Sequence, residues 1–199
     1  MKGLNKSAEH NPNYLAQIVR LKGLRKHSNA DKLQCVTVNG CNIVTDLKAQ
    51  EDDWYVYFPL ECSINKEFLS WSNSFEDKTL NTDKSQKGFF NNKGRVRCLK
   101  LRGERSEGYI IPTLLLMNWL KEKGVELGDW SKSEGVEFDY FEDLMICEKY
   151  IPVVRSGGGL GPKEKKSNVS FIVDGQFRFH SDTEQLGRNI DKISPDDLI

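Results

Sequence analysis

Long apolar runs are the first feature that this 199-residue sequence lacks. No run approaches the roughly 18 consecutive apolar residues of a membrane-spanning helix, so we expect no membrane partner. The N-terminal stretch MKGLNKSAEHNPN also lacks the apolar core of a signal peptide. The five cysteines are odd in number and form no CxxC pair, which favours reduced thiols in a cytoplasmic protein.

Histidine and net charge are scarce as well. The chain has three histidines, and none stands at ligand spacing from a cysteine or another histidine, so we expect no metal site. Lys and Arg together number 29 and so do Asp and Glu, but this balance hides a split. Residues 1–112 carry 18 basic and 13 acidic side chains, whereas residues 113–199 carry 11 and 16. The basic first part indicates contact with a polyanion.

Short strand-like segments dominate residues 1–112, in a chain long enough for one large or two small domains. The Asn39-Gly40 pair is a hairpin turn signal, and the polar residues 72–93 predict a long loop. The expected strands are Leu15–Leu21, Leu33–Val38, Asn42–Leu47, Trp54–Phe58, Gly94–Leu101 and Gly108–Ile111. This pattern predicts a mainly β fold with some α, in which residues 1–112 form a small OB-type β-barrel that binds nucleic acid.

A helical connector is expected over residues 113–154. Its main helix begins with Thr113 as N-cap and ends at Gly124, a typical C-terminal glycine. Apolar residues fall on one face of this helix: Leu116, Met117 and Leu120. A second, short helix is expected over Phe141–Tyr150.

Residues 155–168, RSGGGLGPKEKKSN, have almost nothing to bury and predict a linker. The remaining residues 169–199 are too few to hold a core of their own. They stop at Leu198-Ile199, which follows a turn signal and resembles the beginning of a strand. We therefore expect the last segment to be the opening of an incomplete domain.

The densest basic segment is KGRVRCLKLRGERSEGYIIP, residues 93–112. Arg95 and Arg97 share one face of a strand, but Lys100 and Arg102 are out of phase with them. A β-bulge near Cys98-Leu99 would put all four cations on one face. A cationic stripe that faces RNA is one interpretation, and a solvated strand edge that resists aggregation is the other. The candidate RNA-binding residues are Lys22, Lys26, Arg95, Arg97, Lys100, Arg102 and Arg105.

Two segments resemble known OB domains: His27-Ser-Asn-Ala-Asp-Lys-Leu33 and Arg102-Gly-Glu-Arg-Ser-Glu-Gly108. They resemble the tRNA-binding OB module, which has a His-Pro-Asn-Ala-Asp-Lys-Leu-like turn and a later Arg-Gly-x-x-Ser-x-Gly-like turn. Ser28 replaces the usual proline. They equally resemble the N-terminal OB domain of ATP-dependent RNA ligases in which that domain precedes the nucleotidyltransferase domain.

The tail GQFRFHSDTEQLGRNIDKISPDDLI, residues 175–199, favours the second family, because it looks like the lead-in to the nucleotidyltransferase domain. The resemblance implies RNA end joining or repair, with ATP and Mg²⁺ or Mn²⁺ as cofactors of the full-length enzyme. It also implies that Arg178 and His180 support the ATP site. Residues 169–199 would then begin a truncated nucleotidyltransferase domain that is completed in cis or in trans.

The nucleophilic lysine of that family has no convincing counterpart in this chain. Lys121-Glu-Lys-Gly124 matches Lys-x-x-Gly, but its third position is Lys123 instead of Asp or His. We therefore expect no catalytic residue and no bound cofactor in this chain alone, which should be inactive. The alternatives are a stand-alone tRNA-binding-type OB module without catalysis, and a structural or assembly protein that reuses the barrel.

Overall fold

The computed structural model describes residues 3–125 and 133–152. By its internal contacts the chain divides into Met1–Pro152 and Val153–Ile199, and all the described residues belong to the first unit. The predicted linker and tail, with Arg178 and His180, lie outside the described residues. Within the described ranges, no helix is both long and apolar enough to cross a membrane.

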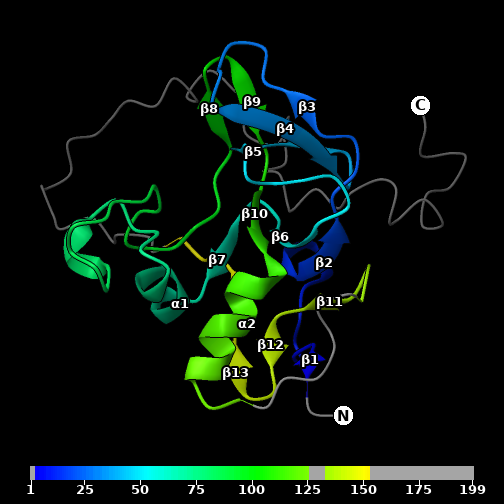
Figure 1. Ribbon diagram of the computed structural model, residues 1–199. Helices are drawn as coiled ribbons and strands as arrows, with labels where there is room; N and C mark the ends of the chain where they lie inside the picture. Colours follow the sequence, from blue (N-terminus) through cyan, green and yellow to red (C-terminus); the bar gives the residue numbers. More distant parts are fainter. Residues whose placement is uncertain (1–2, 126–132, 153–199) are drawn as a thin grey trace, which may run out of the picture. The chain divides into compact units, whose positions relative to one another are not determined.

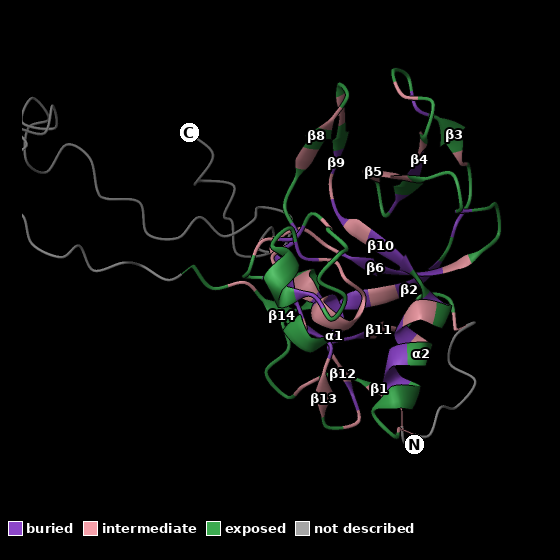
Figure 2. Ribbon diagram, turned by 60° about the vertical axis from the view of Figure 1, so that its left-hand side comes forward, coloured by how far each residue is buried: buried purple, intermediate pink, exposed green. Residues whose placement is uncertain are grey.

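An antiparallel four-stranded sheet forms the centre of the unit, in the order β10-β6-β2-β11 (Figure 1). Its strands are β10 (Tyr109–Pro112), β6 (Trp54–Phe58), β2 (Ala16–Arg20) and β11 (Glu137–Phe138). Successive side chains of a strand point to opposite sides of the sheet, and those of β6 from Tyr55 to Phe58 are all buried (Figure 2). Strand β6 is therefore buried on both faces. Val56 and Phe58 belong to one hydrophobic core, whereas Tyr55 and Tyr57 belong to a second one.

The first core is covered by helix α2 (Thr113–Glu122), whose Leu116, Trp119 and Leu120 are buried. Helix α1 (Lys66–Trp71) contributes Phe68 and Leu69 to the same core. Two small antiparallel sheets are formed by short strands. In the first, β12 (Tyr140–Phe141) pairs with β1 (Leu4–Asn5) on one side and with β13 (Leu144–Met145) on the other. In the second, β7 (Cys62–Ile64) pairs with β14 (Cys147–Lys149). The described ranges also contain two 3-10 helices, η1 (Pro12–Tyr14) and η2 (Lys78–Leu80).

The second core is covered by a three-stranded sheet of β3 (Arg25–Lys26), β4 (Leu33–Val38) and β5 (Cys41–Asp46). The hairpin of β8 (Leu99–Leu101) and β9 (Glu104–Ser106) lies beside β5 and extends away from the central sheet (Figures 1 and 2). Both hairpin turns contain two residues with positive φ. These are Asn39 at 51° and Gly40 at 79°, and Arg102 at 50° and Gly103 at 106°. Type I′ two-residue hairpin turns have positive φ at both central residues.

The predicted mainly β fold with α is confirmed. Strands β4 and β6 have the predicted bounds, and Asn39-Gly40 forms the predicted turn. The described strands form sheets of two to four strands and no closed barrel, so the OB-type assignment stays a prediction. None of the five cysteines, all of which lie in the described ranges, is in a disulfide.

The predicted short helix over Phe141–Tyr150 is wrong, because this segment forms β12, β13 and β14. Glu142 has a φ of 50° and turns the chain between β12 and β13. Strand β14 then pairs with β7, which lies about 85 positions earlier in the chain. These long-range pairings override the local apolar pattern.

The predicted strand over Gly94–Leu101 is also too long. Only Leu99–Leu101 is a regular strand, preceded by an isolated bridge between Arg95 and Ser63. At the start of α2, Thr113 is the first helical residue rather than the N-cap, and its hydroxyl donates to the carbonyl of Trp54 at 3.2 Å. The predicted helix end is close, since Gly124 has a φ of 77° just after the C-cap.

Candidate nucleic-acid interface

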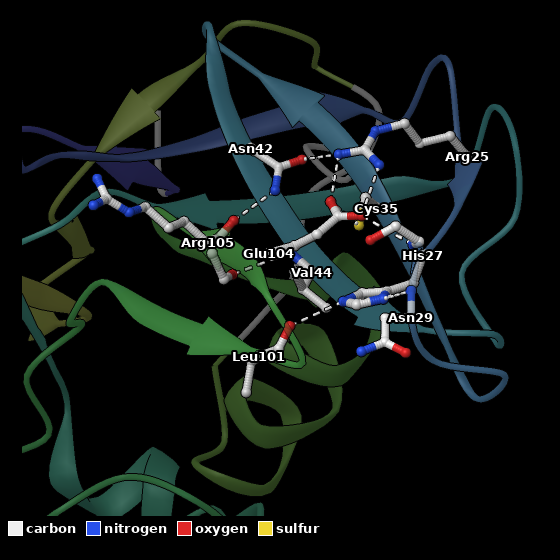
Figure 3. A network of polar contacts seen from close by, with 11 residues as sticks. Arg25, His27, Asn29, Cys35, Asn42, Val44, Leu101, Glu104 and Arg105 are labelled. Atoms are coloured by element: carbon white, nitrogen blue, oxygen red, sulfur yellow. Dashed lines mark hydrogen bonds and ion pairs between the residues drawn. The ribbon is translucent and has the colours of Figure 1, made fainter.

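The side chain of His27, in the first segment that resembles OB domains, contacts Leu101, the residue just before the second segment (Figure 3). This side chain is buried, with 2% of its residue surface exposed. Its Nδ1 accepts the backbone N–H of Asn29 at 3.0 Å, so the ring proton sits on Nε2 and is donated to the carbonyl of Leu101, also at 3.0 Å. The turn before β4 is thereby attached to β8.

Glu104 makes the second connection between the two segments (Figure 3). Its carboxylate accepts two hydrogen bonds from Arg25, at 2.6 and 3.2 Å, and one from the backbone N–H of Ser28 at 3.0 Å. The thiol of Cys35 donates a further hydrogen bond at 3.1 Å. The Arg25 guanidinium, followed by the other donors, holds the pKa of Glu104 well below its usual range, so the carboxylate is ionised.

His27, Cys35 and Glu104 place their ligand atoms within 4.8 Å of one another, a spacing that could hold a metal ion. The donor set does not fit one. Both His27 nitrogens are used by the backbone, and the Arg25 guanidinium occupies the carboxylate. Burial raises the pKa of Cys35 to about 11, whereas a metal ligand must be a thiolate. The three residues form a hydrogen-bond network.

Other residues of the same segments fasten the β8–β9 hairpin to its neighbours. The Asn42 side chain accepts from Arg25 and donates to the carbonyl of Arg105. The Ser106 hydroxyl accepts the N–H of Val44 at 3.0 Å. An isolated two-stranded hairpin is marginal in water, so these contacts hold β8 and β9 in place.

Four cations lie on or next to this hairpin: Arg97, Lys100, Arg102 and Arg105. All four are exposed, and none makes an ion pair within the described ranges. Lys100 stands directly opposite Arg105 in the pairing of β8 with β9, and Arg102 lies in the turn. The structure therefore brings these candidates together, although no continuous strand carries them.

The other three candidates have partners in the described residues. Arg95 donates to Glu61 at 2.6 Å, and its guanidinium lies 4.7 Å from the centre of the Tyr150 ring. The remaining pairs are longer, Lys22 with Glu134 at 3.7 Å and Lys26 with Asp31 at 4.0 Å. Arg95 is therefore less available to a phosphate than the four unpaired cations, whereas the long and exposed pairs of Lys22 and Lys26 leave these two side chains accessible.

A cavity of about 460 Å³ lies beneath the hairpin, between β5, β10 and the segment 95–101. Leu99 and Leu101 line it, while Lys100 between them is exposed, as strand alternation requires. Aromatic side chains that sequence reasoning missed complete the lining, among them Phe89 and Tyr109. The available signal was the pair Phe89-Phe90 within an otherwise polar stretch.

Comparison with protein-family models and with curated proteins gives no match. Among solved structures the chain is similar to RNA ligase from Naegleria gruberi. A mutant with ATP and Mn is 18% identical, with a TM-score of 0.46 over 71% of this chain and 37% of that one. The ligase with PPi is 21% identical, with a TM-score of 0.43 over 72% and 37%. A mutant with AMP and Mn is 19% identical, with a TM-score of 0.45 over 70% and 36%. The chain thus spans about a third of the length of these structures.

Proposed function

We propose that this chain is the RNA-binding N-terminal part of an ATP-dependent RNA ligase that acts in RNA end joining or repair. The observation that carries the proposal is the joining of the two segments that resemble the OB domain of that family. They are about 70 residues apart in sequence, yet Glu104 of the second accepts the N–H of Ser28 in the first, and His27 bonds Leu101, just before the second. Together these contacts hold the β8–β9 hairpin in place with its cations exposed to solvent.

The arrangement of the cations favours a phosphate ligand over a merely solvated strand edge. Lys100 and Arg105 face each other across β8 and β9, and like charges directly opposite one another destabilise an antiparallel pair. A phosphate bound between them would offset this repulsion and release its counterions. Arg97 and Arg102, which are also exposed and without an ion pair in the described ranges, add positive charge on either side of Lys100 in the sequence.

ATP and Mg²⁺ or Mn²⁺ belong in this proposal to the longer enzyme, because the described residues do not fit them. Lys121 lies exposed in the last turn of α2, where a cation is favourable to the helix dipole. Lys123, at the position where the family motif has Asp or His, pairs with Glu67. We assign no adenylylation step to this chain, and its catalytic partner domain would act in cis or in trans.

The second candidate is a stand-alone tRNA-binding-type OB module, since the same two segments resemble that module equally. The two functions differ in what the gene encodes after Ile199. A Lys-x-(Asp/His)-Gly motif in the following codons would favour the ligase, and a stop codon would favour the module.

RNA binding is tested by the salt dependence of the affinity for a single-stranded RNA oligonucleotide. Each lost phosphate contact lowers the slope of log K against log salt by about 0.7 for a single strand. The double variant Arg97→Ala/Lys100→Ala should therefore bind more weakly, with a slope smaller by about 1.4. The matched control is Lys66→Ala/Lys121→Ala, which removes two exposed, unpaired cations on α1 and α2. An unchanged slope in the first variant would mean that the hairpin cations are only solvated.

A further inference from the structure

The cavity beneath the hairpin has the size and the opening of a ligand site. Its volume of about 460 Å³ lies within the roughly 300–1,000 Å³ that is usual for small-molecule pockets. It opens to solvent, because Phe89 in its lining is 45% exposed and Arg97 is exposed as well. The two features that border this opening are therefore an aromatic ring and an unpaired cation.

The aromatic wall consists of three rings in mutual contact. The Phe89 ring lies 5.2 Å from Tyr109, centroid to centroid, in an edge-on arrangement, and 4.6 Å from Phe90. Phe90 in turn packs edge-on against Tyr109 at 4.9 Å. An exposed ring that its neighbours hold in place offers a flat stacking surface with little conformational entropy to lose.

Polar groups of the lining lack partners in the part of the chain that the structure describes. The Nε of Arg95 is buried with no acceptor, although the other end of the guanidinium bonds Glu61. The Tyr55 hydroxyl also makes no hydrogen bond to a described residue. Burial and the nearby Asp46 carboxylate raise the pKa of Tyr55, so the hydroxyl stays a donor. Two donors are therefore available to a polar ligand, together with the Asp46 carboxylate, of which one oxygen already accepts the N–H of Lys48.

We propose that this cavity takes one unpaired nucleobase of single-stranded RNA, stacked on Phe89, with its polar edge toward Tyr55 and Asp46. Arg97 lines the cavity and is also one of the unpaired cations, so a base in the cavity brings its own phosphate to Arg97. The neighbouring phosphate then reaches Lys100. The proposal rests on the proposed RNA binding and specifies that the RNA is unpaired where it meets the hairpin.

The test compares two oligomers with equal phosphate number, a single-stranded oligoadenylate and an abasic ribose-phosphate chain. Stacking of one base on an aromatic side chain corresponds to a preference of about fivefold to a hundredfold for the base-bearing oligomer. Phe89→Leu keeps an apolar side chain but removes the stacking face, so it should lose most of this preference and retain its affinity for the abasic chain. Phe89→Trp should retain the preference. Leu114→Ala, which removes an exposed apolar side chain on α2 outside the lining, is the matched control.

The outcomes separate this inference from the proposed function. If the wild-type protein binds both oligomers equally, with an affinity that falls with salt as phosphate contacts require, RNA binding stands and the base site is refuted. If Phe89→Leu keeps the full preference with an unchanged unfolding midpoint, the base site is likewise refuted. Binding of neither oligomer would overturn both proposals.

Discussion

Replacing His27 with Phe should release the β8–β9 hairpin while leaving the central sheet intact. Phenylalanine has a ring of similar size, but it can neither accept the N–H of Asn29 nor donate to the carbonyl of Leu101. The hairpin consists of two three-residue strands and depends on such contacts for its position. The substitution therefore removes an anchor without opening a cavity.

The size of the expected effect depends on how exposed the two backbone groups are that lose their hydrogen bond to His27. Asn29 is exposed, so water can take over its N–H, and that loss is small. Leu101 is half-buried, so its carbonyl loses a hydrogen bond and is only partly rehydrated. Together these losses should lower the free energy of local opening by about 1–3 kcal/mol. Amides that exchange through this opening should then exchange about fivefold to a hundredfold faster.

Hydrogen exchange measured residue by residue is the assay. We expect faster exchange in β8 and β9 and unchanged exchange in β6, which is buried on both faces. His27→Gln is the matched control, because its amide can still donate toward Leu101 and should cause a smaller change. Unchanged exchange in the hairpin of His27→Phe would refute the anchoring role. Equal acceleration in β6 and the hairpin would refute it too, since that result means global destabilisation.

Two further predictions concern charge and catalysis. The pKa of Glu104 is lowered from its ordinary value of 4.5, chiefly by Arg25, so its contribution to stability is complete above about pH 5 and shrinks as the pH falls below 4.5. The stability difference between wild type and Glu104→Gln should therefore shrink on acidification, and a difference that is constant with pH would contradict the network. Incubation with labelled ATP and Mg²⁺ or Mn²⁺ should give no covalent AMP adduct, because Lys121 lies in an exposed helix end. An adduct that Lys121→Ala abolishes would reverse this assignment.

Short patterns in the sequence correctly predicted those elements whose conformation is decided by a few neighbouring residues. The Asn39-Gly40 pair has a backbone conformation that selects a tight hairpin, and Trp54–Phe58 is apolar on both faces because two cores meet there. The pattern over Phe141–Tyr150 failed because its partners, β1 and β7, are distant in the chain. Strand pairing across such distances leaves no periodic trace in the segment itself.

The candidate site was predictable in composition but not in geometry. The basic character of residues 93–112 pointed to the hairpin, yet nothing local showed that Arg95 would be taken by Glu61 and Tyr150. The partnership of Arg25 with Glu104 spans 79 positions, and Phe89 was hidden in a polar loop. Side-chain neighbours of this kind are decided by tertiary packing, which single-sequence patterns do not contain.

The two segments that resemble OB domains and the hairpin cations have different roles, and this difference can be tested. His27 and Glu104 use their polar atoms on the protein, so they are positioning residues for the hairpin. Lys100 has no protein partner in the described ranges and is free for phosphate. His27→Phe should therefore weaken RNA binding and accelerate exchange in the hairpin, whereas Arg97→Ala/Lys100→Ala should flatten the salt slope without accelerating exchange, since it removes the repulsion between Lys100 and Arg105. If the cation variant also frees the hairpin, the charges serve its stability, and the phosphate interpretation fails.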